Sequence, residues 1–125
     1  MGDLLRQGTE WLERQRHAHL SSSVSYHRGP LAVALLATIG KTVFEVDGGH
    51  GFLERVESRD YLVRAEDLVF GGQAVLPQRG DRIQELEEGV TFIYEVMAPG
   101  REPFFRYSDP YRKTLRIHTK LVRRI

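Results

Sequence analysis

The sequence predicts a mainly β protein, a small antiparallel β-barrel or sandwich that carries an N-terminal α-helix and one long loop. Short runs of β-branched and aromatic residues recur through residues 24–122, and Gly, Pro, Ser or Asp residues bound them. Residues 75–83 place Pro-x-x-Gly-Asp between two apolar runs, a pattern typical of a turn that begins a new strand. Residues 113–122 alternate apolar and polar side chains, as a half-buried strand does.

Length and composition favour one globular domain over residues 1–125, with a helix in residues 1–20 and a β-barrel in residues 24–122. The chain is 41% hydrophobic and 28% charged, which is ordinary for a globular protein. It has no cysteine, so disulfides, thiolate metal sites and cysteine nucleophiles are excluded. The longest apolar run, residues 31–39, is too short to span a bilayer, and the N-terminus lacks the order of a signal peptide. We therefore expect a cytoplasmic chain with no membrane partner.

Residues 3–20 are predicted to form an amphipathic helix. Leu4, Trp11 and Ala18 recur at intervals of seven, and charged residues occupy the other side. Gly8 weakens this helix by roughly 1 kcal/mol relative to alanine. Because so short a helix is marginal in water, its Trp11 face is expected to dock, either on one end of the domain or on a partner protein.

The first half of the β region is expected to contain several short strands. Residues 24–28 alternate like a strand and end at Gly29-Pro30. Residues 31–39 have the Ala and Leu content of a helix but the length and neighbours of a strand, and we interpret them as a strand. Gly40-Lys41 is expected to turn the chain into a further strand at residues 42–46.

The second half is organised around a hairpin. Residues 47–51 hold three glycines but lack the Lys-Ser/Thr of a phosphate-binding loop, so they are expected to form a plain turn. One or two strands follow in residues 52–65, with a helical turn near residues 65–69. Residues 83–96 read as two antiparallel strands joined at Glu87-Glu88-Gly89. The core is expected from the apolar faces of the strands: Val33, Leu35, Phe44, Leu62, Ile83, Phe92, Tyr94, Val96, Leu115 and Ile117.

Residues 98–111 are predicted to form a long loop with three prolines and four aromatic residues. Loops of this length usually carry function. Phe104, Phe105, Arg106 and Tyr107 could stack on nucleic-acid bases and contact phosphates, or bind a protein partner. Alternatively the aromatic side chains anchor the loop on the barrel while Arg106 faces water. We rank the anchoring interpretation first, a protein partner second and nucleic acid last, because a domain with a net charge of only +1 binds polyanions poorly.

Charge is unevenly distributed along the chain. Residues 66–102 carry eight acidic and three basic side chains, a net −5, whereas residues 103–125 carry seven basic and one acidic, a net +6. Arg116 and Lys120, on the polar face of the last strand, are therefore expected to meet the acidic surface of a neighbouring copy in a head-to-tail ring. The competing interpretation is that both charge blocks pair within one subunit.

The residue types predict no catalytic, cofactor or metal site. His17 and His19 point to different sides of the predicted helix, and the other histidines have no second ligand at metal-binding spacing. The serines lack a Gly-x-Ser-x-Gly elbow. We therefore expect a protein that is not an enzyme, although a buried, convergent polar pocket would reopen that class.

Several short motifs occur in a suggestive order: Tyr26-His27-Arg28-Gly29, Arg59-Asp60-Tyr61-Leu62-Val63, Leu76-Pro77-Gln78-Arg79-Gly80-Asp81-Arg82-Ile83 and Tyr94-Glu95-Val96. With the basic strand that ends the chain, this order resembles the head-tail joining proteins (head completion, or stopper, proteins) of tailed phages and prophages. The resemblance covers most of residues 24–122, and the N-terminal helix departs from it.

The resemblance implies a structural protein of the virion neck, present in the cytoplasm of the bacterial host before assembly. Such subunits form a ring beneath the portal and adaptor, close the channel of packaged DNA and present the surface to which the tail attaches. The implied partners are other copies of the chain, portal or adaptor and tail proteins, with contact to packaged DNA left open. Residues 47–51 and 98–111 would face the channel or neighbouring subunits. The alternative is a small β-barrel module that binds single-stranded nucleic acid.

Overall fold

The structure is a computed structural model that describes residues 21–49, 51–100 and 102–125. The predicted N-terminal helix and Trp11 lie outside these residues. The strands are β1 (Ser22–Arg28), β2 (Leu31–Asp47), β3 (Leu53–Arg64), β4 (Val69–Phe70), β5 (Gln73–Ala74), β6 (Arg82–Glu87), β7 (Val90–Val96), β8 (Phe105–Tyr107) and β9 (Thr114–Arg124), with one 3₁₀ turn, η1 (Ala65–Asp67). The prediction of a mainly β chain is confirmed.

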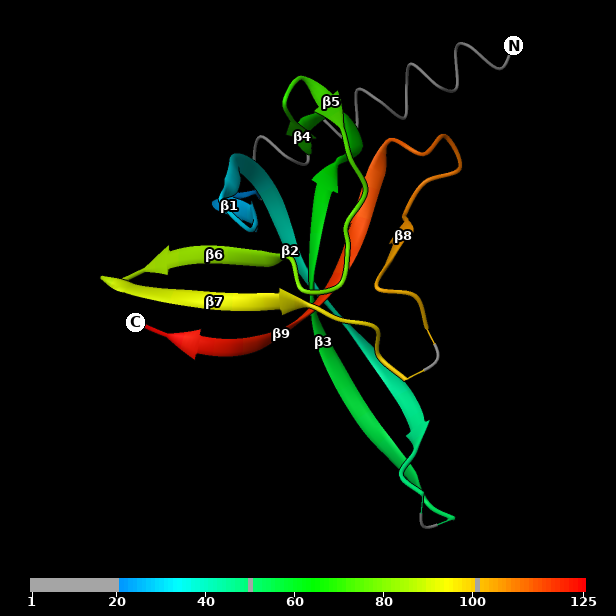
Figure 1. Ribbon diagram of the computed structural model, residues 1–125. Coiled ribbons are helices and arrows are strands. Elements are labelled where there is room, and N and C mark those ends of the chain that lie inside the picture. The colour runs from blue at the N-terminus through cyan, green and yellow to red at the C-terminus, as the bar shows by residue number, and fades with distance from the viewer. Residues whose placement is uncertain (1–20, 50, 101) are drawn as a thin grey trace.

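One antiparallel sheet in the order β3-β2-β1-β6-β7-β9-β8 makes up most of the molecule, and β4 and β5 form a separate hairpin (Figure 1). Two long strands bend this sheet back on itself. Residues 31–37 of β2 pair with β1 and residues 37–47 with β3. Residues 114–119 of β9 pair with β3, and residues 119–124 pair mainly with β7.

The prediction of a small antiparallel β-barrel or sandwich is confirmed as an antiparallel sheet, but the sheet is not a closed barrel. β3 pairs with both β2 and β9, so the sheet curls back on itself, while each long strand continues past its neighbours. Residues 40–47 of β2 and 53–58 of β3 extend away from the body as a two-stranded ribbon (Figure 1). We call this ribbon the arm.

The predicted turn at Gly40-Lys41 is wrong, because β2 runs through these residues as one strand. A Cβ atom at Gly40 would lie 3.4 Å from both Leu62 Cδ1 and Arg116 Nη1, an ordinary van der Waals distance. The expectation that residues 31–39 form a strand is confirmed. A glycine between two β runs therefore does not by itself mark a chain reversal.

The predicted hairpin is confirmed as β6 and β7, which pair from Arg82–Glu95 to Glu87–Val90. Its two-residue connection, Glu88-Gly89, has φ of 51° and 80°, the left-handed conformation that a tight hairpin turn requires at both positions. Gly80, with φ of 89°, likewise supplies the left-handed residue of the turn before β6.

The core lies inside the curled sheet. Of the predicted core residues, Leu35, Leu62, Ile83, Val96, Leu115 and Ile117 are buried, whereas Val33, Phe44, Phe92 and Tyr94 are half-buried. Sequence patterning missed several buried residues: Val24, Tyr26, Ala37, Tyr61, Val63, Leu68 and Ile93. Two of these are tyrosines, whose burial depends on hydrogen-bond partners that a hydrophobic pattern does not reveal.

The predicted loop of residues 98–111 is not irregular throughout. It contains β8, which pairs with β9 through Phe105–Ile117, Arg106–Arg116 and Tyr107–Leu115. Asp109 then organises the turn into β9, because its carboxylate accepts hydrogen bonds from the backbone N–H of Tyr111, Lys113 and Thr114. The segment is therefore tied to the sheet at its centre and at its end.

Ile117→Asp should unfold the protein. Ile117 is fully buried in the core, and an unpaired carboxylate there costs several kcal/mol against a total stability of about 5–15 kcal/mol. Val122→Asp, at an exposed position of the same strand, is the matched control and should change stability by less than about 1 kcal/mol. Thermal unfolding followed by circular dichroism measures both, and equal melting temperatures for the two variants would contradict the core assignment.

Candidate functional site

Asp81, the last residue of the Pro-x-x-Gly-Asp turn, is the hydrogen-bond acceptor at the centre of a buried polar cluster. Its carboxylate accepts hydrogen bonds from the hydroxyl of Tyr26 at 2.5 Å, from Arg28 Nη2 at 2.9 Å and from the backbone N–H of Gln78 at 2.9 Å. Arg28 Nη2 also donates to the carbonyl of Leu76 at 2.7 Å. Burial, followed by the contact with Asp81, raises the pKa of Tyr26, so its phenol remains a donor. The cluster ties the end of β1 to the turn before β6.

Asp60 is the centre of a second cluster and is 0% exposed. It accepts hydrogen bonds from His118 Nδ1 at 2.9 Å, Ser58 Oγ at 2.5 Å, Arg116 Nη1 at 2.7 Å and the Thr42 hydroxyl. Burial alone would raise the pKa of Asp60, but the donors, His118 foremost, outweigh it and hold that pKa well below its usual 3.8. The cluster joins β2, β3 and β9.

The residue types in this cluster are those of a catalytic triad, but their geometry is not. Ser58 Oγ and Asp60 both contact the same ring atom, His118 Nδ1, at 3.4 and 2.9 Å. A proton relay needs the serine and the carboxylate on opposite nitrogens of the imidazole. Ser58 and His118 are also only 1% and 2% exposed, so a substrate cannot reach them. The cluster is a structural one.

Glu85 on β6 anchors a third cluster. Arg59 Nη2 contacts both carboxylate oxygens of Glu85, at 2.8 and 3.0 Å, and the hydroxyl of Tyr61 donates to the same group. The Arg59 guanidinium also lies over the Tyr94 ring, 4.8 Å from its centroid. Since β3 and β6 are not neighbours in the sheet, this cluster bridges across the curled interior.

These three clusters explain the motifs that carry the family resemblance. Tyr26 and Arg28 contact Asp81, whereas Arg59 and Tyr61 contact a residue of the central hairpin. Tyr26, Arg28 and Asp81 are thus bonded to one another, and Arg59 and Tyr61 to Glu85, so these motif residues position strands.

Two kinds of feature are absent among the described residues: metal-ligating clusters and membrane-spanning helices. Among them, no group of three or more His, Cys, Asp or Glu side chains is arranged to hold a metal ion. Within the same ranges, no helix combines the length and apolar character needed to cross a membrane.

The predicted aromatic and basic segment is divided by its strand. Phe104, Phe105 and Tyr107 are half-buried and pack against the core, whereas Arg106 is exposed. The Arg112 guanidinium lies 5.7 Å from the centroid of the Tyr107 ring. The three aromatic side chains thus lie as the anchoring interpretation expects. Partner binding by this segment remains a prediction.

The two basic residues predicted to meet a neighbouring copy have different surroundings. Arg116 is not free for a neighbour, because its guanidinium is bound to the buried Asp60 carboxylate. Lys120 is exposed, and its Cα lies opposite that of Glu95 in the β7–β9 ladder. The acidic hairpin and the basic last strand are therefore adjacent in one sheet, which brings part of the two charge blocks together within a single subunit.

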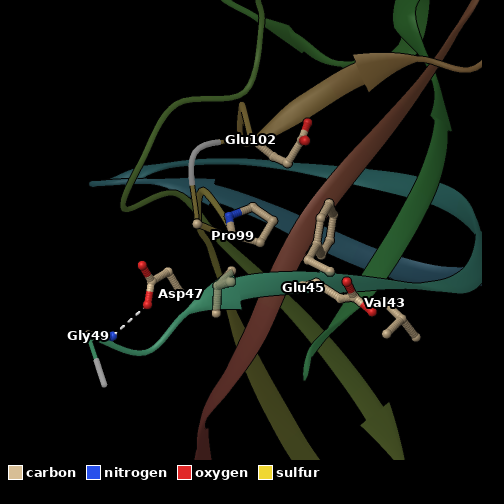
Figure 2. Close-up of a pocket in the computed structure, with 9 residues that line it drawn as sticks. Val43, Glu45, Asp47, Gly49, Pro99 and Glu102 are labelled. Atoms are coloured by element: carbon tan, nitrogen blue, oxygen red, sulfur yellow. Dashed lines mark hydrogen bonds between the residues drawn. The ribbon is translucent and has the colours of Figure 1, made fainter. Parts of the chain in front are cut away.

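A cleft that sequence reasoning missed lies beside the arm (Figure 2). It has a volume of about 720 Å³, and we call it the arm cleft. Its walls are residues 43–47 of β2 on one side and the segment near Pro99 on the other, and its lining is Val43, Phe44, Glu45, Val46, Asp47, Gly49, Pro99, Gly100 and Glu102. No local motif marks the cleft, because it joins segments more than 50 residues apart in sequence.

Large apolar side chains are exposed at two ends of the molecule. Phe52 and Leu53, at the tip of the arm, are 76% and 68% exposed. A second group lies at the far end of β6, β7 and β9: Leu86, Val90, Leu121, Val122 and Ile125. Exposed apolar groups of this kind mark surfaces that contact another protein.

The fold and these surfaces define a small β protein. Its buried ion pairs connect the strands, and the arm and several strand edges are exposed. The chain belongs to the phage head-tail joining protein family, whose model matches residues 2–125. The resemblance inferred from the sequence is therefore confirmed. A search of curated proteins finds no match. Head-tail joining is a structural role, and it places the protein at the neck of a phage particle.

Asp60→Asn should lower stability at neutral pH by about 3 kcal/mol, because Arg116 and His118 lose their charged acceptor. The pKa of Asp60 is lowered by folding, so its stabilising effect is present above the unfolded-state value near 4 and disappears as pH falls below it. The difference between wild type and variant should therefore narrow between about pH 5 and pH 2. Urea unfolding over this range tests it, and a difference that does not change with pH would refute the assignment.

Arg116→Glu and Lys120→Glu should behave differently. The first places a carboxylate beside Asp60 and should cost about 3 kcal/mol or more. The second alters an exposed side chain and should cost less than about 1 kcal/mol. Denaturant titrations measure both. Equal, small effects would show that the Arg116–Asp60 pair does not hold β9 to β3.

Proposed function

We propose that the chain is a ring subunit of the phage neck that joins head to tail and closes the channel of packaged DNA. The observation that carries this proposal is the family match over residues 2–125. The projecting arm supports it, because a ribbon that leaves the body can reach a neighbouring subunit or the channel axis. Copies of the chain would gather in the host cytoplasm and dock beneath the portal or adaptor, and the tail would then attach to them.

The exposed apolar tip of the arm supports a role in contacts between proteins. Phe52 and Leu53 have lost little of their accessible surface on folding, so each can still bury most of a large side chain on assembly. The glycine-rich turn beside them and residues 98–111 are the segments that we propose to face the channel or adjacent subunits. Trp11 is proposed as a further contact with the portal, adaptor or tail.

Deletion of the gene from its phage should yield heads that fill with DNA but do not hold tails, and complementation with wild type should restore plaques. Negative-stain microscopy of the lysate reads out heads, tails and joined particles. Purified protein at high concentration should form rings, and sedimentation measures this. Normal tailed particles from the deletion phage would overturn the proposal. Salt-dependent binding of the purified protein to single-stranded oligonucleotides, without rings, would favour the nucleic-acid module instead.

Phe52→Ser with Leu53→Ser should leave the melting temperature nearly unchanged and sharply reduce plaque titre, because both side chains are exposed in the subunit. Leu36→Ser is the matched control, since Leu36 is 50% exposed but lies on the body of β2. Plaque titres from complementation assays compare them. A double variant that complements as well as wild type would show that the arm tip contacts nothing in the neck.

A further inference from the structure

The arm cleft follows the free edge of a strand. It touches all five residues 43–47 of β2, and consecutive strand residues alternate between faces, so a cavity that touches all five runs along an edge rather than across a face. The other edge of these residues is occupied by β3. Within the described parts of the chain, no strand pairs with the cleft edge. The cleft therefore offers unpaired backbone groups that an incoming strand can use.

The side chains around this edge select for a basic and apolar strand. Glu45, Asp47 and Glu102 line the cleft, and among the described residues none of them forms an ion pair. Asp47 Oδ1 accepts a hydrogen bond from the backbone N–H of Gly49 at 2.9 Å (Figure 2). Val43 and Pro99 add apolar surface between these charges. An extended segment that mixes cationic and aliphatic side chains would match both properties.

The chain itself contains such a segment at its C-terminal end. Residues 120–125 carry three basic and three aliphatic side chains: Lys120, Leu121, Val122, Arg123, Arg124 and Ile125. All six are exposed. Pairing between β9 and β3 ends at Thr119, so beyond that point β7, on the opposite edge, is the only strand of the described residues that pairs with β9. We call residues 120–125 the basic end.

The basic end cannot fill the cleft of its own subunit. Figure 1 shows the C-terminus on the side of the molecule away from the arm, with the body of the sheet between them. Among the residues that the structure describes, no strand fills the acidic edge at one side of the subunit or the basic edge at the other. Such a pair of complementary surfaces is heterologous, and repeating it generates a ring when the rotation closes.

We propose that the arm cleft receives the basic end of a second copy of this chain as an added strand. This proposal rests on the ring proposed above and identifies its subunit interface. Backbone hydrogen bonds between residues 43–47 of one copy and residues 120–125 of the next extend the sheet across the interface. Contacts of Lys120, Arg123 and Arg124 with Glu45, Asp47 and Glu102 set which strand enters.

A charge exchange tests the pairing. Glu45→Arg with Glu102→Arg makes the cleft basic, and Arg123→Glu with Arg124→Glu makes the basic end acidic. Each double variant alone should lose the ring species, and an equimolar mixture should regain it, because each basic cleft then meets an acidic end and each acidic cleft a basic end. Glu66→Lys with Asp67→Lys is the control, since both are exposed acidic residues of η1, outside the cleft lining and the basic end, and it should assemble like wild type. Sedimentation measures ring content, and melting temperatures confirm that each variant folds.

Cysteine cross-linking tests the same contact by distance, because the chain has no cysteine of its own. A disulfide requires Cα atoms within about 7 Å. A panel of double variants joins one cysteine at Val43, Glu45 or Asp47 with one at Leu121, Arg123 or Ile125. At least one pair should give a ladder of covalent multimers under oxidation, whereas each single cysteine should not form chains beyond a dimer.

The outcomes separate this interface from the function that it serves. Wild-type rings whose assembly survives both charge reversals, without any cross-linked ladder, would overturn the interface and leave the proposed neck function standing. A ladder that forms with a tail or adaptor protein but not between copies would also overturn it, since the cleft would then hold a different strand. A deletion phage that makes normal particles would remove the function itself.

Discussion

The fold depends most on the buried carboxylate of Asp60. It lies where β2, β3 and β9 meet, and its donors come from all three strands. A charge with no exposed surface is costly to remove from water, so it persists only where several donors converge on it. That requirement fixes the position at which β9 crosses β3 and at which the sheet turns back. Asp81 and Glu85 impose similar constraints at the end of β1 and across the interior.

The pairing of arginine side chains with buried carboxylates determines which surface features are available to bind a partner. Arg28, Arg59 and Arg116 are bound to internal carboxylates, so they do not contribute an exposed basic face that would attract nucleic acid. The features left exposed are the basic end, a projecting ribbon, unpaired strand edges and apolar ends. A protein that joins other proteins benefits from such features, because strand edges and apolar tips remain available until a partner covers them. The same features would favour aggregation in a protein without partners.

Local patterns predicted much of the fold and little of the candidate site. The hairpin of β6 and β7 was recognisable because Glu88-Gly89 and the alternating residues around it act over a few positions. The pairing of Arg116 with Asp60 was not predicted, because alternation on β9 places Arg116 on the polar face and nothing local reveals that Asp60 lies opposite that face. β2 continues through Gly40 and Lys41 because these residues pair with Asp60 and Arg59 of β3, a pairing that no local pattern reveals. The arm cleft likewise arises only when β2 and the segment near Pro99 come together.

We propose that internal carboxylates hold the sheet so that its free edges can join one subunit to the next. Electron cryomicroscopy of the assembled neck, at a resolution that separates β-strands, can show both features. We expect one continuous sheet across each subunit boundary, with residues 120–125 of one copy lying beside residues 43–47 of its neighbour. We also expect the Asp60 cluster to be unchanged by assembly. A ring in which the edge of β2 faces solvent, or in which Arg116 leaves Asp60 to contact a neighbour, would contradict this proposal.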